Sequence, residues 1–206
     1  MEKQPLIKLE PLFPRFYARA KIDRKFTKRE FHFVENQILD YNETLEKYYS
    51  KSRNILDDKR MRGIRNFINE ALDACLKKAL TPKNRTSIYV TQSWLNYINE
   101  GMGHQSHYHD NSFYSGILYI QVNENDGINF HKRREEPLTV ISEKYHMYNS
   151  ASWFTPVEQG DLIIFPSHMS HSVNKSTSQK TRISLSFNTF VSGHWGDRTS
   201  LTHLKL

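Results

Sequence analysis

Three histidines and one aspartate fall within the seven-residue stretch HQSHYHD. His107 and His109 are two positions apart, and side chains with that spacing on a β-strand point to the same face of the sheet. Two imidazoles at a strand end can bind one metal ion if a third ligand comes from elsewhere in the fold. A second stretch, FPSHMSHSV, offers His168 and His171 directly after an apolar run. The spacing predicts a metal site where two strands end.

The segment TRISLSFNTFV, residues 181–191, alternates between apolar and polar side chains, as a β-strand does. One face carries Ile183, Leu185 and Phe187, and the other carries Arg182, Ser184, Ser186 and Asn188. A polar strand face usually meets water, but inside a small barrel it can line a pocket for an acidic ligand. An arginine among hydroxyl groups is well suited to hold a carboxylate through two parallel hydrogen bonds.

Each of these features alone is common in proteins that bind neither a metal nor an acid. A single histidine is more often a surface or structural residue than a ligand, and an alternating strand is more often half-exposed than catalytic. The combination favours a site, because the H-x-H pair, the distal His171 and Arg182 follow one another in one β-rich half of the chain.

The half of the chain after residue 85 consists of short runs rich in β-branched and aromatic residues, separated by turn residues. These runs predict strands at residues 86–98, 115–122, 127–131, 137–141, 160–166 and 181–191. Several short strands without intervening helices are typical of an antiparallel sandwich or barrel, of which the jelly roll is one kind.

The part before these strands has a helical pattern. Apolar residues recur at helical spacing over residues 31–49 and again from about Leu56 to Leu80, which predicts two helices. Pro82 ends the second helix. The first 27 residues carry prolines and predict an irregular arm with an edge strand.

These patterns together indicate one domain over residues 1–206. Within it, residues 1–84 form the arm and the supporting helices, and residues 85–206 form the β core. The chain has 37% hydrophobic and 13% aromatic side chains, which is enough to bury a core at this length.

The composition limits the class of protein further. The net charge of +7 invites nucleic-acid binding, but the positive residues are spread along the chain, which a solvated basic helix face explains equally well. The single cysteine, Cys75, excludes an internal disulfide and fits a core position in a reducing compartment. No run approaches the roughly 18 apolar residues of a membrane span, and the N-terminus does not have the pattern of a signal peptide. We expect a cytoplasmic protein without membrane contact.

Two longer stretches carry a family resemblance. They are TQSWLNYINEGMGHQSHYHDNSFYSGILYI and GDLIIFPSHMSHSVNKSTSQKTRISLSFNTFVSG. The chain resembles the iron(II)- and 2-oxoglutarate-dependent oxygenases, in particular the prolyl-hydroxylase-like group of tailed phages and marine bacteria, over roughly residues 85–206. The resemblance implies a mainly β fold with N-terminal helices. This fold is a double-stranded β-helix, a distorted and cupin-like jelly roll, braced by α-helices.

The resemblance also implies roles for individual residues. His107 and His171 correspond to the two histidines of the family's facial triad, which binds iron(II) and leaves positions open for 2-oxoglutarate and oxygen. Arg182 corresponds to the basic residue that pairs with the far carboxylate of 2-oxoglutarate. Tyr119 resembles a tyrosine whose hydroxyl group helps to hold the same carboxylate.

Further expectations concern residues near these positions. Ser184 faces the same way as Arg182, and Asn96 lies on the strand before the H-x-H pair, so both are interpreted as cosubstrate-binding residues. Trp94 shares a strand face with Asn96 and is expected in the core. His104 and His168 either orient a ligand imidazole or a bound water, or have no special role.

The sequence departs from the family pattern at one ligand. Where the family has H-x-D, this chain has H-x-H, so His109 occupies the position of the aspartate. Either His107, His109 and His171 bind the metal, or Asp110 supplies a carboxylate after a bulge at the strand end. We favour the three histidines, because on an extended strand Asp110 points to the opposite face from His107. A structural metal site without oxygen chemistry is the remaining alternative.

The function that the resemblance implies is an iron(II)- and 2-oxoglutarate-dependent dioxygenase with O₂ as cosubstrate, which hydroxylates a protein or peptide side chain of the proline type. A bacteriophage-encoded chain would act in the host cytoplasm. Two alternatives stay open. One is a cupin-like protein that binds metal and 2-oxoglutarate without turnover, and the other is an oxygenase that modifies nucleic acid.

Overall fold

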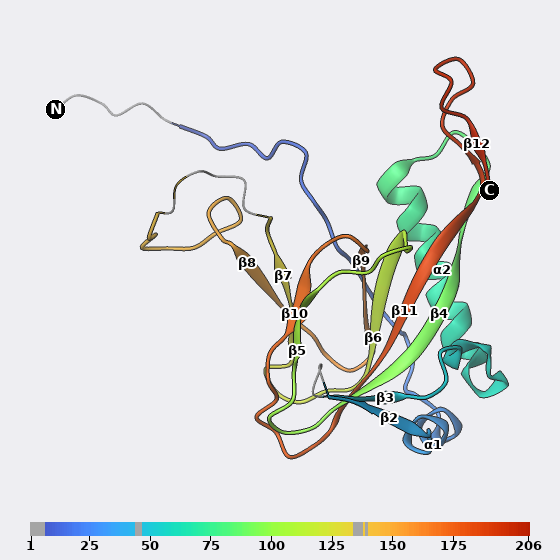
Figure 1. Ribbon diagram of the computed structural model, residues 1–206, viewed down its shortest axis with the longest axis vertical. Coiled ribbons are helices and arrows are strands. Elements are labelled where there is room, and N and C mark those ends of the chain that lie inside the picture. Colours follow the sequence, from blue (N-terminus) through green and yellow to red (C-terminus); the bar gives the residue numbers. More distant parts are fainter. Residues whose placement is uncertain (1–6, 44–46, 134–137, 139) are drawn as a thin grey trace.

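The computed structural model describes residues 7–43, 47–133, 138 and 140–206, and it consists of two antiparallel sheets with helices on one side (Figure 1). The larger sheet has the order β1 (Ala18–Lys21), β9 (Asp161–Pro166), β6 (Tyr114–Gln121), β11 (Arg182–Trp195), β4 (Thr86–Ile98), β3 (Lys47–Ser50), β2 (Leu39–Asn42), with β12 (Leu204–Lys205) paired to β11. The smaller sheet has the order β5 (His104–His107), β10 (His171–Val173), β7 (Gly127–His131), β8 (Ser152–Pro156). The expectation of a mainly β fold is confirmed.

The central strands β6 and β9 of the larger sheet are buried on both faces. On β6 and β9, Leu118 and Leu162 point into a core that includes the helices. Their neighbours Ile117 and Ile163 point the other way, into a second core that also contains Phe130 of the smaller sheet. Because successive side chains of a strand point to opposite faces, a strand buried on both faces needs a continuous apolar run. The runs ILYI and LIIF meet this need.

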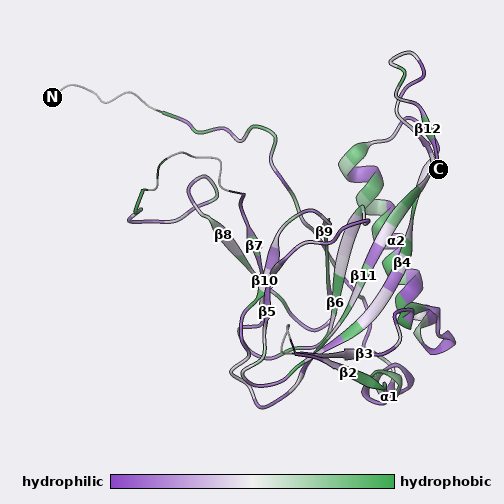
Figure 2. Ribbon diagram, viewed as in Figure 1, coloured by the Kyte–Doolittle hydropathy of each residue, from purple (hydrophilic) through white to green (hydrophobic). Residues whose placement is uncertain are grey.

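The helices cover the face of the larger sheet that is turned away from the smaller sheet. Helix α2 (Arg62–Leu80) follows two short 3₁₀ turns, Ile55–Asp57 and Lys59–Met61. It buries one apolar stripe, which consists of Ile64, Ile68, Leu72, Cys75 and Leu76. Hydrophobic and hydrophilic segments alternate along its ribbon in Figure 2, as expected for a helix with one face in the core. The predicted second helix and the core position of Cys75 are confirmed.

The predicted helix over residues 31–49 is confirmed over residues 31–35 and wrong over residues 39–42 and 47–49, which are strands. Helix α1 (Lys28–Glu35) begins at Thr27, which forms a capping box with Glu30, and it ends after two turns. The chain then forms the hairpin of β2 and β3, whose second strand pairs with β4 through Tyr48↔Tyr97. The spacing of the aromatic residues fits a helix or a strand, and the neighbouring strand β4 decides the outcome.

The strand predictions of the β-rich half agree better with the structure. Residues 86–98 and 127–131 coincide with β4 and β7, and the other predicted strands match β6, β9 and β11 within a few residues. The expected edge strand of the arm is β1, which pairs with β9 at one edge of the larger sheet. The strand predicted at 137–141 lies partly outside the described residues, and its described positions 138, 140 and 141 are exposed and not in a strand. Strand β8 was not predicted.

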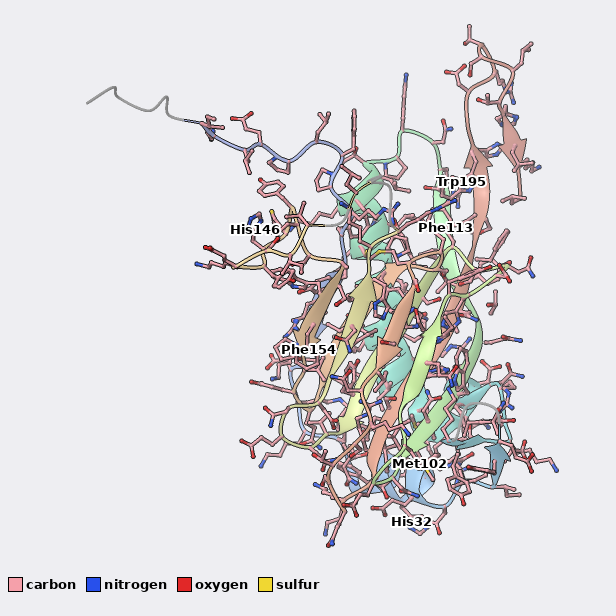
Figure 3. All side chains as sticks on the ribbon, turned by 60° about the vertical axis from the view of Figure 1, so that its left-hand side comes forward. His32, Met102, Phe113, His146, Phe154 and Trp195 are labelled. Carbon is pink, nitrogen blue, oxygen red and sulfur yellow. The ribbon has the colours of Figure 1, made fainter. Side chains whose placement is uncertain are left out.

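The C-terminal end of β11 extends the larger sheet beyond the sandwich. There it pairs with β12, and Trp195 packs against Phe113 with ring centroids 5.5 Å apart (Figure 3). In the described part of the chain, no helix is long and apolar enough to cross a membrane.

Candidate metal centre

Three histidines converge where β5 ends and β10 begins. His107 is the last residue of β5 and His171 is the first of β10, and the antiparallel register pairs them directly. His109 lies two residues beyond the end of β5. One ring nitrogen of each of these three residues lies within 4.8 Å of those of the others. Three nitrogen donors at this separation can bind a single metal ion.

His109 reaches the cluster although it lies outside the strand. Its backbone N–H donates to the carbonyl of Ser167 at 2.9 Å, which holds the chain beside the turn that follows β9. Its ring stacks on Trp94 with centroids 5.9 Å apart, and it lies almost parallel to the ring of His171 at 5.2 Å. His107 and His109 therefore point to the same place, as their two-residue spacing predicts. Only His107 lies in a strand.

Backbone contacts orient two of the imidazoles. Nδ1 of His107 lies 2.9 Å from the carbonyl oxygen of Gln105, and Nδ1 of His171 lies 3.0 Å from that of Met169. A carbonyl only accepts hydrogen bonds, so each Nδ1 carries the proton and donates. The Nε2 atom of each ring is then unprotonated and free to bind a metal, which is the usual arrangement for a histidine ligand.

Burial keeps the imidazoles neutral. Burial is the largest cause, and together with the neighbouring histidines it lowers the pKa of His171 to about 3 and that of His109 to about 4. Burial is also the main cause that lowers the pKa of His107. A metal binds only the neutral imidazole, so the cluster is in its binding form at neutral pH.

Three other residues near the cluster are candidates from the sequence. Asp110 is exposed in a turn, and the described group of metal-compatible side chains contains no carboxylate. His168 is also exposed, in the turn before β10. His104, in contrast, lies against the cluster, with its ring centroid 3.8 Å from that of His107.

A cavity of about 360 Å³ opens beside the three histidines, between the two sheets. The polar face of β11 lines it with Arg182, Ser184 and Ser186, while the apolar face of that strand packs into the helix-side core. Asn96 and Tyr119 of the neighbouring strands also line it. The structure thus brings all of the predicted cosubstrate-binding residues and all three predicted ligands to one cavity.

Two buried donors in this cavity lack a partner among the described residues. They are Nε of Arg182 and the hydroxyl group of Tyr119, whose side chains are almost fully buried. Burial raises the pKa of Tyr119 to about 12, so the hydroxyl group keeps its proton. The carboxylate of Asp126 lies beside Arg182, with Nη1 and Oδ1 3.6 Å apart. Buried polar groups are normally hydrogen-bonded, so these donors fit a bound acid.

The sequence did not indicate two further residues of the cavity. Trp94, expected in the core, is only half-buried and lines the cavity instead. Lys47 lies in the stretch that was predicted as a helix, but as the first residue of β3 it points into the cavity with Tyr49. The only signal in the sequence was the alternation of Lys47 and Tyr49, which is too short to separate a strand from a helix.

Residues 92–188 match the model of the family described as putative 2OG-Fe(II) oxygenase. The chain is a 2-oxoglutarate-dependent dioxygenase. Its cofactors are iron(II) and 2-oxoglutarate, and the three clustered histidines can bind a metal ion. The matched segment runs from β4 to β11 and contains every residue that was predicted to bind metal or cosubstrate.

Solved structures of oxygenases have the same fold as this dioxygenase. HygX from Streptomyces hygroscopicus, with nickel and 2-oxoglutarate bound, is 10% identical with a TM-score of 0.58, covering 85% of this chain and 82% of that one. A prolyl-4-hydroxylase from Pseudomonas putida is 12% identical with a TM-score of 0.52, covering 84% and 92%. A prolyl hydroxylase from Trichoplax adhaerens, in complex with a peptide fragment, is 10% identical with a TM-score of 0.56, covering 84% and 83%.

These likenesses confirm the predicted jelly-roll fold of the dioxygenase with its two sheets. No curated protein matches the sequence.

Proposed function

We propose that this dioxygenase hydroxylates a protein or peptide side chain of the proline type, with His107, His109 and His171 as the iron ligands. One observation carries the ligand assignment. Three neutral imidazoles meet at the same cavity as Nε of Arg182 and the hydroxyl group of Tyr119, two buried donors without a partner among the described residues. The choice of a peptide substrate is supported by the likeness to two prolyl hydroxylases, one of them with a bound peptide fragment.

Each side chain has a separate task in this proposal. The Nε2 atoms of His107 and His171 bind the metal, because their Nδ1 atoms are engaged with backbone carbonyls. Arg182 and Tyr119 donate hydrogen bonds to the far carboxylate of 2-oxoglutarate, which satisfies their buried donors. Iron(II) and 2-oxoglutarate, when bound, supply an oxidation in which O₂ is the oxidant, 2-oxoglutarate becomes succinate and carbon dioxide, and a substrate C–H becomes C–OH.

The all-histidine cluster is the departure from the usual triad of two histidines and a carboxylate. Replacing an aspartate by a neutral histidine leaves the metal site more positive by one unit of charge. The proposal therefore needs a direct test of turnover. Succinate release from 2-oxoglutarate should depend on iron(II), and it should be lost in His171→Ala and retained in His168→Ala, which changes an exposed histidine outside the cluster. Equal activity in both variants would remove the proposal.

The alternative from the sequence is a cupin-like protein that binds metal and 2-oxoglutarate without turnover, and the match to the oxygenase family speaks against it. It predicts that calorimetry detects 2-oxoglutarate binding that depends on Arg182, while no succinate forms with any divalent metal. Succinate formation would exclude it. The prolyl-hydroxylase-like group of phages and marine bacteria, and a place in the cytoplasm, stay predictions from the sequence.

A further inference from the structure

A lysine is buried in the cavity without an anionic partner among the described residues. The side chain of Lys47 is 5% exposed. Its Nζ lies 3.2 Å from Oδ1 of Asn96, and 3.2 and 3.3 Å from the two ring nitrogens of His104. An ammonium group only donates hydrogen bonds, so the His104 nitrogen that it meets accepts, and an imidazole with an accepting nitrogen is neutral. Both contacts are thus polar but uncharged.

The surroundings of Lys47 destabilise its charged ammonium form. The described residues that line the cavity include Lys47, Arg53 and Arg182 but no aspartate or glutamate. Burial and the positive charges of Arg182 and Arg53 lower the pKa of Lys47 to about 8. The ammonium group therefore keeps most of its charge at neutral pH. A buried charge without a counter-ion is unfavourable, so its presence indicates a place for an anion.

The strand register places Lys47 at the same end of the cavity as Arg182. Asn96, which accepts a hydrogen bond from Lys47, lies opposite Ser184 in the ladder between β4 and β11. Arg182 lies opposite Ile98 in the same ladder, two positions further along. Residues two positions apart on a strand share a face, so Asn96 and Ile98 point the same way. Among the neighbouring charges, that of Arg182 lowers the pKa of Lys47 most.

We propose that Lys47 and Arg182 bind the far carboxylate of 2-oxoglutarate together, as two cations on one anion. This inference rests on the cosubstrate site proposed above and adds a residue from outside the matched family segment. A carboxylate can accept about four hydrogen bonds, so it can satisfy Nε of Arg182, the hydroxyl group of Tyr119 and the Lys47 ammonium at once. Its negative charge removes the repulsion between the two buried cations.

Arg182 and Lys47 differ in the carboxylates that already lie near them. Arg182 already has a carboxylate at 3.6 Å, that of Asp126, which offsets part of its charge. Lys47 has no carboxylate partner among the described residues. The hairpin of β2 and β3 is therefore part of the cosubstrate site, and not only an extension of the sheet. The near carboxylate of 2-oxoglutarate, or a carboxylate of the substrate, could use the same chemistry, and the experiment separates these sources.

The test compares two ligands of the manganese-loaded protein by calorimetry. 2-Oxoglutarate carries both carboxylates, and 2-oxopentanoate is the same keto acid without the far one. Lys47→Met should weaken binding of 2-oxoglutarate about tenfold or more, and should leave binding of 2-oxopentanoate unchanged. Lys47→Gln, which keeps a polar side chain but no charge, should behave like Lys47→Met. Lys51→Met, an exposed lysine of the same hairpin, is the matched control and should have no effect.

Three outcomes would overturn the inference. Equal weakening of both ligands would assign Lys47 to the near carboxylate or to a structural role. Unchanged affinity for both ligands in Lys47→Gln would leave only a carboxylate of the substrate as its partner. If the unaltered protein does not bind 2-oxoglutarate, both the proposed cosubstrate site and the role of Lys47 in it are wrong. Binding without succinate release, in contrast, removes the proposed hydroxylation and keeps Lys47 in place, so the two failures are distinguishable.

Discussion

His107 and His171 face each other across the ladder between β5 and β10, with ring centroids 4.2 Å apart. Both residues are at a strand end, and each Nδ1 contacts the carbonyl oxygen two residues earlier in the chain. The backbone of two neighbouring strands therefore fixes both the separation and the orientation of these imidazoles. His109 joins them from outside the strand, and its position depends on the turn after β9.

This arrangement predicts which residues bind the metal. His107→Ala, His109→Ala and His171→Ala should each weaken binding of manganese or iron(II) about tenfold or more, because each removes one of three ligands. Asp110→Ala should leave the affinity unchanged, because its side chain is exposed in a turn. Metal titration followed by calorimetry measures the affinities. A large loss in Asp110→Ala together with full binding in His109→Ala would show that the carboxylate is the third ligand.

Metal should also stabilise the folded chain. A metal that binds only the native state raises the melting temperature as its concentration rises above the dissociation constant. Thermal unfolding should therefore shift upwards when manganese is added to the unaltered protein, and the shift should disappear in His171→Ala. His168→Ala should keep it, since His168 is exposed and outside the cluster. A shift of equal size in His171→Ala would argue against this site.

Removing the Tyr119 hydroxyl group should have opposite effects on binding and on stability. The hydroxyl group is buried without a partner among the described residues, so Tyr119→Phe should leave the free energy of unfolding of the ligand-free protein unchanged or raise it. Affinity for 2-oxoglutarate should fall by about a factor of ten, the value of one hydrogen bond to a charged group. Chemical denaturation and calorimetry measure the two quantities. A large loss of stability with unchanged affinity would mean that Tyr119 has only a structural role.

Binding of 2-oxoglutarate should weaken at alkaline pH. Lys47 has a pKa of about 8 in the ligand-free protein, and a bound carboxylate raises this pKa because it favours the ammonium form. The contribution of Lys47 to affinity is therefore fully present below pH 8 and is lost as the pH rises towards the pKa of the complex. The charged and titratable groups around it are Arg53, Arg182 and His104, and His104 stays neutral across this range. Calorimetry between pH 7 and 10 should show the decrease, and Lys47→Gln should abolish it. A decrease that persists in Lys47→Gln would come from another group.

In helix α2, substitutions should lower the free energy of unfolding strongly only at the buried apolar residues. Leu72 is fully buried in the core of α2, so Leu72→Ala should lower the free energy of unfolding by about 2–5 kcal/mol. Leu80, the last residue of the same helix, is 43% exposed, and Leu80→Ala should cost less than about 1 kcal/mol. Denaturant unfolding of both variants measures the difference. Equal losses would mean that the C-terminal turn of α2 is packed more tightly than its exposure indicates.

The sequence by itself determined much of the β core and of the site. The alternation of β11 placed Arg182, Ser184 and Ser186 on one face, and the two-residue spacing of the H-x-H pair indicated convergent imidazoles, because a strand repeats every two residues. The continuous apolar runs of β6 and β9 marked the strands buried on both faces. Local periodicity is sufficient for such statements, since each concerns residues within one element.

Only the tertiary structure decided the secondary structure of residues 39–50 and the position of the Lys47 side chain. The stretch has aromatic residues at a spacing that suits a helix or a strand, and pairing with β4 selects the strand. That pairing, not the local sequence, turns Lys47 into the cavity beside Asn96, 49 residues away along the chain. Contacts between residues far apart in the sequence have no local periodicity. For this reason the predicted ligands could be found in the sequence, whereas the buried cation beside them could not.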